Sequence, residues 1–182
     1  MRHQRGISFI EVLVSLVILS TGIIGAVAMQ ASAKKGSFDA MQRSMASALA
    51  QDIIERMRAN DSDPLNLENY QGSYGAGNLS APDNRCDDPD TPCNSLQMVS
   101  NDLYEWEQKL IGSNVSQGSK SLGGLVGAQG CIEHNNQAVT VVVSWQGRVQ
   151  TQDSADSNDT LAFGCGTASD KRRQVQISAF IF

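Results

Sequence analysis

The residue whose type and position most demand a chemical explanation is Glu11, an acidic residue at the edge of a long apolar segment. A carboxylate at the centre of a membrane helix costs about 2.5–3.5 kcal/mol, so such a group normally has a function or a partner. The chemistry open to Glu11 is pairing with a positively charged amine. The alternative is that its side chain extends to the membrane interface and stays hydrated there.

Four cysteines form the second group of reactive side chains: Cys86, Cys93, Cys131 and Cys165. Their number is even and no pair has CxxC spacing, which favours two disulfides over a zinc site or a thioredoxin-like centre. Disulfides indicate an oxidising compartment. Four cysteines allow three connectivities, and we favour pairing in chain order, Cys86 with Cys93 and Cys131 with Cys165, over the two crossed patterns.

The composition offers little support for other chemistry. The net charge is -5, whereas nucleic-acid-binding proteins usually have a basic face, so we expect no nucleic-acid partner. Two histidines, His3 and His134, are too few for a multi-histidine metal site or a histidine-based catalytic centre. No GxSxG, Walker A, GxGxxG or HExxH pattern occurs. We therefore predict a protein without catalytic activity, cofactor or metal ion.

The apolar segment that follows Glu11 is long enough to cross a membrane. Residues 12–33 include no charged residue, and as a helix they are roughly 33 Å long, close to the roughly 30 Å of a bilayer core. Arg2 and Arg5 precede the segment and predict a cytoplasmic N-terminus, while Lys34 and Lys35 after it are a weaker, opposing signal. We expect a single pass, with the cysteine-containing remainder outside the cytoplasm.

Such a segment has three possible fates. It can remain as a permanent signal anchor. It can be a secretory signal, because "ASA" at residues 31–33 has the small-x-small form of a signal-peptidase site. However, the apolar stretch exceeds the roughly 7–15 residues usual in a cleaved signal peptide. The third fate is cleavage before the apolar segment.

The third fate is suggested by the residues "RGISFIEVLVSLVIL", which resemble the N-terminal signature of type IV pilins and the related pseudopilins. That signature is a short basic leader ending in glycine, a hydrophobic first mature residue and glutamate at the fifth mature position. Gly6, Ile7 and Glu11 occupy these positions here. The usual first mature residue is phenylalanine, so Ile7 is a mild departure.

The resemblance implies a defined processing route. A prepilin peptidase would remove the leader, residues 1–6, by cutting between Gly6 and Ile7, and would then methylate the new amino group of Ile7. The mature chain would stay among the lipids of the bacterial inner membrane until it is extracted into a filament. Glu11 would then pair with a positive amine, that of a neighbouring subunit, and so set the axial register. Near one another, the two buried charges offset each other's desolvation.

Within this superfamily, the chain most resembles the PilV group of minor pilins, on the strength of "SFIEVLVSLVILSTGIIGA" followed by "LAQDIIERMRAN". That resemblance implies a subunit that primes pilus assembly in a tip or initiation complex. Its partners would be other minor pilins and the major pilin, and contact with a tip adhesin is left open. The close alternative is a minor pseudopilin of a type II secretion system.

The helix is expected to continue past the membrane to about residue 59, where "NDSDP" ends it because Pro64 cannot continue a helix. Apolar residues recur at steps of three and four along residues 34–60 and predict a buried stripe: Phe38, Met41, Met45, Ala48, Leu49, Ile53 and Met57. Glu55, Arg56 and Arg58 are predicted to face solvent.

The remainder, residues 61–182, predicts a periplasmic α+β domain. Residues 61–94 and the segment before residue 174 are interpreted as loops, including the solvated acidic groups around Asp88 and Asp156. A second amphipathic helix covers residues 96–110 and ends at Gly112. Strands are predicted at residues 125–133, 138–145 and 174–182. Together they predict a pilin-like fold, in which a small antiparallel sheet covers the long helix.

Four segments follow: a leader at residues 1–6, an apolar helix at 7–33, its amphipathic continuation at 34–60 and the domain at 61–182. Two further hypotheses come from other classes. A signal-anchored periplasmic binding domain would keep its N-terminus intact. A secreted soluble protein would start at Lys34.

Overall fold

A computed structural model of the protein describes residues 6, 8–60, 65–113, 115–118, 120–121 and 123–181. The chain divides into two compact units, Met1–Phe38 and Asp39–Phe182. Ile7, the leader residues 1–5, Pro64 and the last residue of the chain, all of which carry expectations from the sequence, lie outside the described residues.

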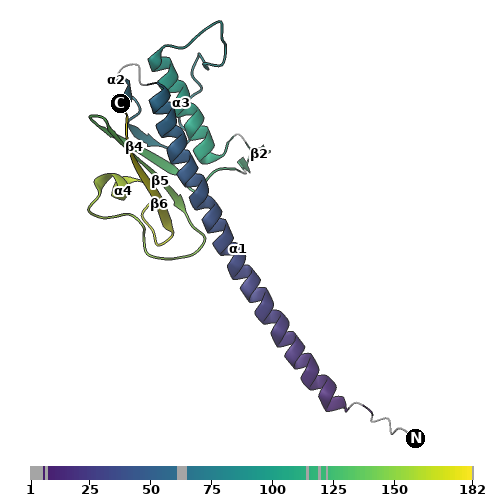
Figure 1. Ribbon diagram of the computed structural model, residues 1–182. Helices are drawn as coiled ribbons and strands as arrows, with labels where there is room; N and C mark the ends of the chain where they lie inside the picture. Colours follow the sequence, from purple (N-terminus) through teal and green to yellow (C-terminus); the bar gives the residue numbers. More distant parts are fainter. Residues whose placement is uncertain are drawn as a thin grey trace. The chain divides into compact units, whose positions relative to one another are not determined.

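Helix α1, Phe9–Ala59, is the longest element, and its first part belongs to the first unit (Figure 1). It is the one helix of the described chain that is long and apolar enough to cross a membrane. Its apolar side chains are exposed here, for example Phe9 at 78% and Ile24 at 69%. Such a surface requires lipid or protein around it, because large continuous apolar patches are rarely left in water.

Residues of α1 from Asp39 onward supply one wall of the core of the second unit. The buried face comprises Gln42, Ala46, Leu49, Ala50, Ile53, Ile54 and Met57. The predicted stripe was therefore right at Leu49, Ile53 and Met57, but wrong at Met41, which is 52% exposed, and at Ala48, which is also exposed.

Helix α3, Ser95–Ile111, confirms the second predicted helix. Asn94 and Gln97 form a reciprocal capping box at its N-terminus, which satisfies two backbone donors. The helix ends at Gly112, as the sequence predicted, and Gly112 has the left-handed conformation with φ 67°. A side chain at Gly112 would meet the backbone carbonyl carbon of Gly123 at 1.9 Å, so glycine is required there.

The sheet of the second unit has the order β1-β4-β5-β6, and every neighbouring pair is antiparallel. Its strands are β1 (Gly72–Tyr74), β4 (Gln129–Asn135), β5 (Ala138–Gln146) and β6 (Arg172–Phe180). The predicted turn between β4 and β5 is confirmed, with Asn136 at φ 56°. A separate two-stranded sheet joins β2 (Ser116–Gln117) to β3 (Lys120–Ser121).

The two faces of the four-stranded sheet pack against different elements. Val139, Val141 and Val143 of β5 join α1 and α3 in the main core. Val142 faces the other way and packs with Cys131, Cys165 and Ala162. Ala162 belongs to the short helix α4, Thr160–Gly164, so α4 covers the face opposite α1 and α3 (Figure 1).

The fold confirms the α+β, pilin-like expectation and corrects some of its details. Residues 61–94 were interpreted as one long loop, but they include helix α2, Leu65–Glu68, and strand β1. The loop before β6 includes α4. These elements are short, and their own residues carry no periodic pattern. The sheet consequently has four strands where three were predicted.

Candidate functional site: the processing and docking segment

Glu11 lies in the first turn of α1 and contacts the residue that precedes the helix. Its Oε2 accepts a hydrogen bond of 2.9 Å from the backbone N–H of Ser8, and its own N–H donates to the Ser8 carbonyl at 3.0 Å. A glutamate that reaches back from the third helical position to the N-cap backbone is half of a capping box. Glu11 therefore has a local partner even without an amine at Ile7.

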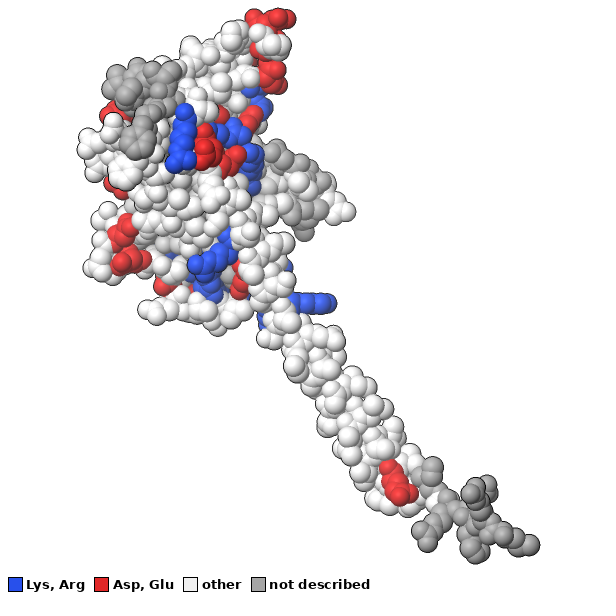
Figure 2. Space-filling view, in the orientation of Figure 1, with Lys and Arg blue, Asp and Glu red and all other residues white. Residues whose placement is uncertain are grey.

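Glu11 is also electrostatically well placed. The N-terminal end of a helix carries a partial positive charge, which favours a carboxylate in the first turn. Between Ser8 and Ala33 it is the only charged residue, and Figure 2 shows acidic atoms near one end of a long run of uncharged atoms. The hydrogen bond from Ser8 therefore holds one carboxylate in the first turn of an apolar helix.

The predicted cleavage position adjoins this turn. Gly6 is exposed, and a Cβ added there would meet nothing within 4 Å. Packing within the described chain therefore does not require glycine at this position. Ile7, the predicted site of methylation, lies outside the described residues, and both modifications stay predictions.

The hydroxyl groups in the apolar half of α1 bond within the helix. Ser15 donates to the Val12 carbonyl at 2.8 Å, and Ser20 donates to the Val17 carbonyl at 2.9 Å. Such back-bonding satisfies the hydroxyls without water. Because lipid supplies no hydrogen-bond partners, this is what a polar group on a lipid-facing or filament-facing helix requires.

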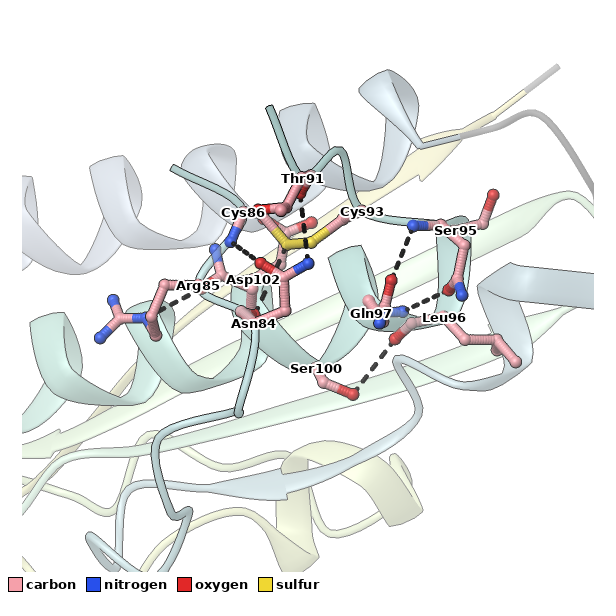
Figure 3. Close-up of a disulfide and its surroundings, with 12 residues drawn as sticks. Asn84, Arg85, Cys86, Thr91, Cys93, Ser95, Leu96, Gln97, Ser100 and Asp102 are labelled. Atoms are coloured by element: carbon pink, nitrogen blue, oxygen red, sulfur yellow. Dashed lines mark hydrogen bonds between the residues drawn. A yellow bond between two sulfur atoms is a disulfide. The ribbon is translucent and has the colours of Figure 1, made fainter. Parts of the chain in front are cut away.

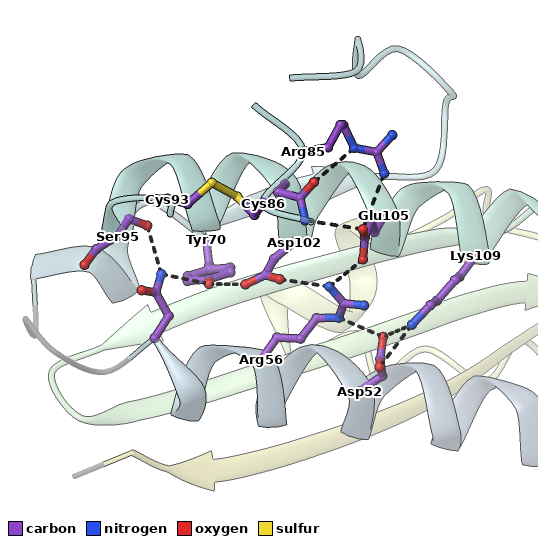
Figure 4. Close-up of polar contacts among 12 residues, drawn as sticks. Asp52, Arg56, Tyr70, Arg85, Cys86, Cys93, Ser95, Asp102, Glu105 and Lys109 are labelled. Atoms are coloured by element: carbon purple, nitrogen blue, oxygen red, sulfur yellow. Dashed lines mark hydrogen bonds and ion pairs between the residues drawn. A yellow bond between two sulfur atoms is a disulfide. The ribbon is translucent and has the colours of Figure 1, made fainter. Parts of the chain in front are cut away.

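A polar network joins α1 to α3 inside the second unit (Figure 4). Asp102 is its centre: Oδ1 accepts from Arg56 at 2.8 Å and Oδ2 accepts from the Tyr70 hydroxyl at 2.7 Å. Burial and the bond to Asp102 raise the pKa of Tyr70. Burial lowers the pKa of Arg56, but Asp102 and the other carboxylates outweigh it and raise the pKa above its ordinary value.

The network corrects the sequence expectation for Arg56. Its side chain is 21% exposed and is paired with Asp52, Asp102 and Glu105, so it does not simply face solvent. Burial would raise the pKa of Glu105, but the bond from Arg56 lowers it. Trp106 of α3 is fully buried. Its Nε1 donates a hydrogen bond of 2.8 Å to the Leu49 carbonyl of α1, which joins the same two helices.

The structure contains both disulfides in the pairing favoured from the sequence, Cys86–Cys93 and Cys131–Cys165. The first closes a loop directly before α3, where the Asn84 side chain accepts from the Cys86 N–H and donates to the Thr91 carbonyl (Figure 3). The second ties β4 to the residue that ends α4.

Two buried charged residues that the sequence did not single out hold loops in place. Glu107 is 2% exposed, and its carboxylate accepts from the backbone N–H groups of Gly75, Gly77 and Leu79. Arg172 is 1% exposed and donates to Asp153 at 2.7 Å.

The Arg172 guanidinium also donates to the carbonyls of Phe163, Cys165 and Gly166. The one signal available was a charged residue, in a predicted helix for Glu107 and in a predicted loop for Arg172. Such a residue has the same sequence pattern whether its side chain is buried or solvated.

These features describe a chain whose long helix is apolar enough to cross a membrane and carries one carboxylate near its start, and whose later turns belong to the core of a small disulfide-bonded α+β unit. The family model for type IV pilin Tt1218 matches residues 28–104. The model for the prokaryotic N-terminal methylation motif matches residues 1–27. The two matches adjoin and together cover residues 1–104, so this part of the chain is similar to a type IV pilin with an N-terminal methylation motif. No characterised protein and no solved structure gives a significant match.

Proposed function

We propose that the protein is a minor pilin of a type IV pilus, a structural subunit that primes pilus assembly as part of a tip or initiation complex. Pilins are structural subunits, and this role requires no catalytic group. The observation that carries the proposal is the placement of Glu11. It is the one acid on the exposed apolar surface before Phe38, and it is held at the first turn of α1 by Ser8.

In this proposal, a prepilin peptidase cuts after Gly6, and the amine of Ile7 is methylated. Ile7 is four residues before Glu11 in the sequence, so cleavage creates the amine close to the carboxylate along the chain. The bond between Glu11 and the Ser8 N–H keeps the carboxylate partly satisfied while the subunit waits in the inner membrane. In the filament, Glu11 accepts the amine of a neighbouring subunit, and the pair offsets the desolvation of both charges.

The assignment to the minor pilins rests on residues 48–60, whose sequence resembles that of the PilV group. In the structure this segment has two tasks. Leu49, Ile53 and Met57 build the core, while Arg56 forms the ion pairs to α3. The segment thus fixes the orientation of α3 on the helix, which supports a subunit with a defined face for other minor pilins.

A deletion with separate readouts tests the proposal against its closest alternative, a minor pseudopilin. The gene is deleted in its own organism, and the full chain is supplied in trans as the control. A minor pilin predicts loss of surface pili and twitching motility with unchanged export of secreted enzymes. Loss of export with normal pili would contradict the proposal and assign the chain to a secretion filament.

A further inference from the structure

A pocket of about 570 Å³ lies within the second unit, lined by residues of α1, β5 and β6 and by the loop at Ser154. Asp39 and Arg43 are four residues apart and therefore share one face of α1. Trp145 and Arg173 are directly opposite each other in the register of β5 and β6, so their side chains are on the same face of the sheet. The volume is within the roughly 300–1,000 Å³ that is typical of ligand pockets.

Trp145 is the buried residue of this lining, with 2% of its surface exposed. Its indole N–H has no hydrogen-bond acceptor among the residues that the structure describes. Trp106, in contrast, donates its indole N–H to the Leu49 carbonyl. Burial takes a donor out of water, so an unpaired buried donor is costly and rare in folded proteins. The indole N–H of Trp145 therefore needs an acceptor that the described residues do not supply.

Two arginines bring positive charge to the same pocket, and neither forms an ion pair with a carboxylate of the described chain. Arg43 is exposed and makes no hydrogen bond to any described residue. Arg173 donates through its two terminal nitrogens to the carbonyls of Arg172 and Val149, at 3.1 Å and 2.6 Å. These bonds orient the guanidinium, and they leave its Nε–H without an acceptor among the described residues.

The charge of the lining indicates the kind of ligand. Two arginines and Asp39 are its charged residues, which leaves one net positive charge. The Asp39 Oδ1 already accepts from the Arg148 backbone N–H at 3.1 Å. A singly charged anion balances the remaining charge, and guanidinium groups bind carboxylates through paired N–H···O bonds.

Shape favours a carboxylate over the other common monoanion, a phosphodiester. A carboxylate is the end of a side chain, so one oxygen reaches a buried N–H while the other contacts a guanidinium. A phosphodiester is substituted on both sides, which hinders its entry to a buried donor. Ala40 and the Trp145 ring also give the pocket apolar surface, which suits the methylene groups of a glutamate side chain.

We propose that this pocket, named the Trp145 pocket, is a binding site for an acidic peptide segment and takes a glutamate carboxylate. The Trp145 N–H and the guanidinium groups of Arg43 and Arg173 donate to the carboxylate, while Ala40 contacts its methylene groups. All of these residues belong to the second unit. The site is therefore independent of processing at Gly6 and of the kind of filament that the chain joins.

Nuclear magnetic resonance of the two indole N–H groups tests the proposal on the full chain. The chain is labelled with nitrogen-15 tryptophan, kept in a neutral maltoside detergent and titrated with acetyl-Ala-Glu-Ala-amide at neutral pH and constant ionic strength. A Trp145→Phe variant assigns the two resonances. We expect the Trp145 indole proton to move downfield by at least about 0.3 ppm, because a charge-assisted hydrogen bond forms. The Trp106 indole proton, which is already bonded, should not move.

Two further compounds define the ligand class. Acetyl-Ala-Gln-Ala-amide has nearly the same shape without the charge and should leave the Trp145 resonance in place. Dimethyl phosphate represents the phosphodiester of a lipid headgroup and should bind at least about tenfold more weakly than the glutamate peptide.

Two variants of α1 separate the pocket from general electrostatic attraction. Arg43→Gln should weaken binding of the glutamate peptide at least about fivefold. Arg58→Gln is the matched control, because it removes the same charge from an exposed pair with Glu55 and should change binding by less than about twofold. An unchanged Trp106 resonance shows that each variant is folded.

Each other result overturns the proposal. A Trp145 resonance that does not respond to the glutamate peptide means that the pocket takes no carboxylate. An equal response to the glutamine peptide means that charge is not recognised. Tighter binding of dimethyl phosphate means that the site fits a lipid headgroup. Equal weakening in the Arg43 and Arg58 variants means that the attraction is not specific to the pocket.

Discussion

The carboxylate of Glu11 accepts a hydrogen bond of 2.9 Å from the backbone N–H of Ser8. This contact resolves the apparent conflict of an acid in an apolar helix. The N-terminal turn supplies one donor and a favourable field, so the carboxylate has a partner before any processing. In the proposed processing, cleavage after Gly6 would create a positive amine four residues before Glu11 in the sequence. The Glu11 carboxylate is thus stabilised before processing and, in the proposed function, is available to dock to a neighbouring subunit.

Glu11→Ala is expected to permit cleavage but to lower the amount of the protein in sheared pili by at least about tenfold, because an unpaired buried amine is costly. Ser8→Ala is the matched control, since it keeps the backbone N–H that Glu11 uses. Immunoblots of membrane and pilus fractions measure both variants. Normal incorporation of the Glu11 variant would contradict the docking role.

Asp102→Asn is expected to destabilise the chain by about 2–4 kcal/mol, because it removes the charge that pairs Arg56 and accepts from Tyr70. It should also bring the pKa of Tyr70 closer to its ordinary value. Denaturation followed by the fluorescence of Trp106 and Trp145 measures the first effect, and ultraviolet titration measures the second.

The control for Asp102 is Glu55→Gln, which breaks an ion pair to Arg58 whose side chains are 65% and 45% exposed. Exposed pairs of this kind contribute at most about 1 kcal/mol. Equal losses in the two variants would mean that the network of Asp102 adds nothing beyond ordinary surface electrostatics.

The ion pair between Asp153 and Arg172 predicts a pH dependence. The bond from Arg172 holds the pKa of Asp153 below its ordinary value of 3.8. A carboxyl group whose pKa is lowered on folding contributes stability above its ordinary pKa and loses it as pH falls through the folded value. The stability difference between wild type and Asp153→Asn should therefore be largest near neutral pH and shrink below about pH 4.

Denaturation between neutral pH and about pH 3 checks this prediction. Asp156→Asn, in the same loop, is the control, because its carboxylate contacts the nearby Asn158. A difference between wild type and Asp153→Asn that stays constant with pH would show that Arg172 does not act through the charge of Asp153.

The two disulfides should differ in what they contribute. Cys131–Cys165 closes a sequence separation of 34 and Cys86–Cys93 one of 7. In the chain-entropy description, replacing both cysteines of each pair by alanine costs about 4 kcal/mol for the long loop and about 2 kcal/mol for the short one. Denaturation of the two double variants orders them, and the reverse order would contradict the loop-length argument.

The sequence predicted those elements whose own residues carry a pattern. The apolar run marked α1, the alternation of Val139, Val141 and Val143 marked β5, and Gly112 marked the end of α3. Strand β1 was missed because its three residues become a strand by pairing with β4. Arg56 was misassigned because its main partner, Asp102, is 46 residues away. A charged residue on a helix has the same local pattern whether it is solvated or buried.

The most direct test of the central claim is the intact mass and the N-terminal sequence of the protein purified from its own organism, beside a Gly6→Val variant. A subunit of a pilus-type filament predicts a mature chain that begins at Ile7 and carries one methyl group on its amine. The Gly6→Val chain should retain residues 1–6 and stay in the inner membrane. A wild-type chain that still begins at Met1, or that begins at Lys34, would contradict the account.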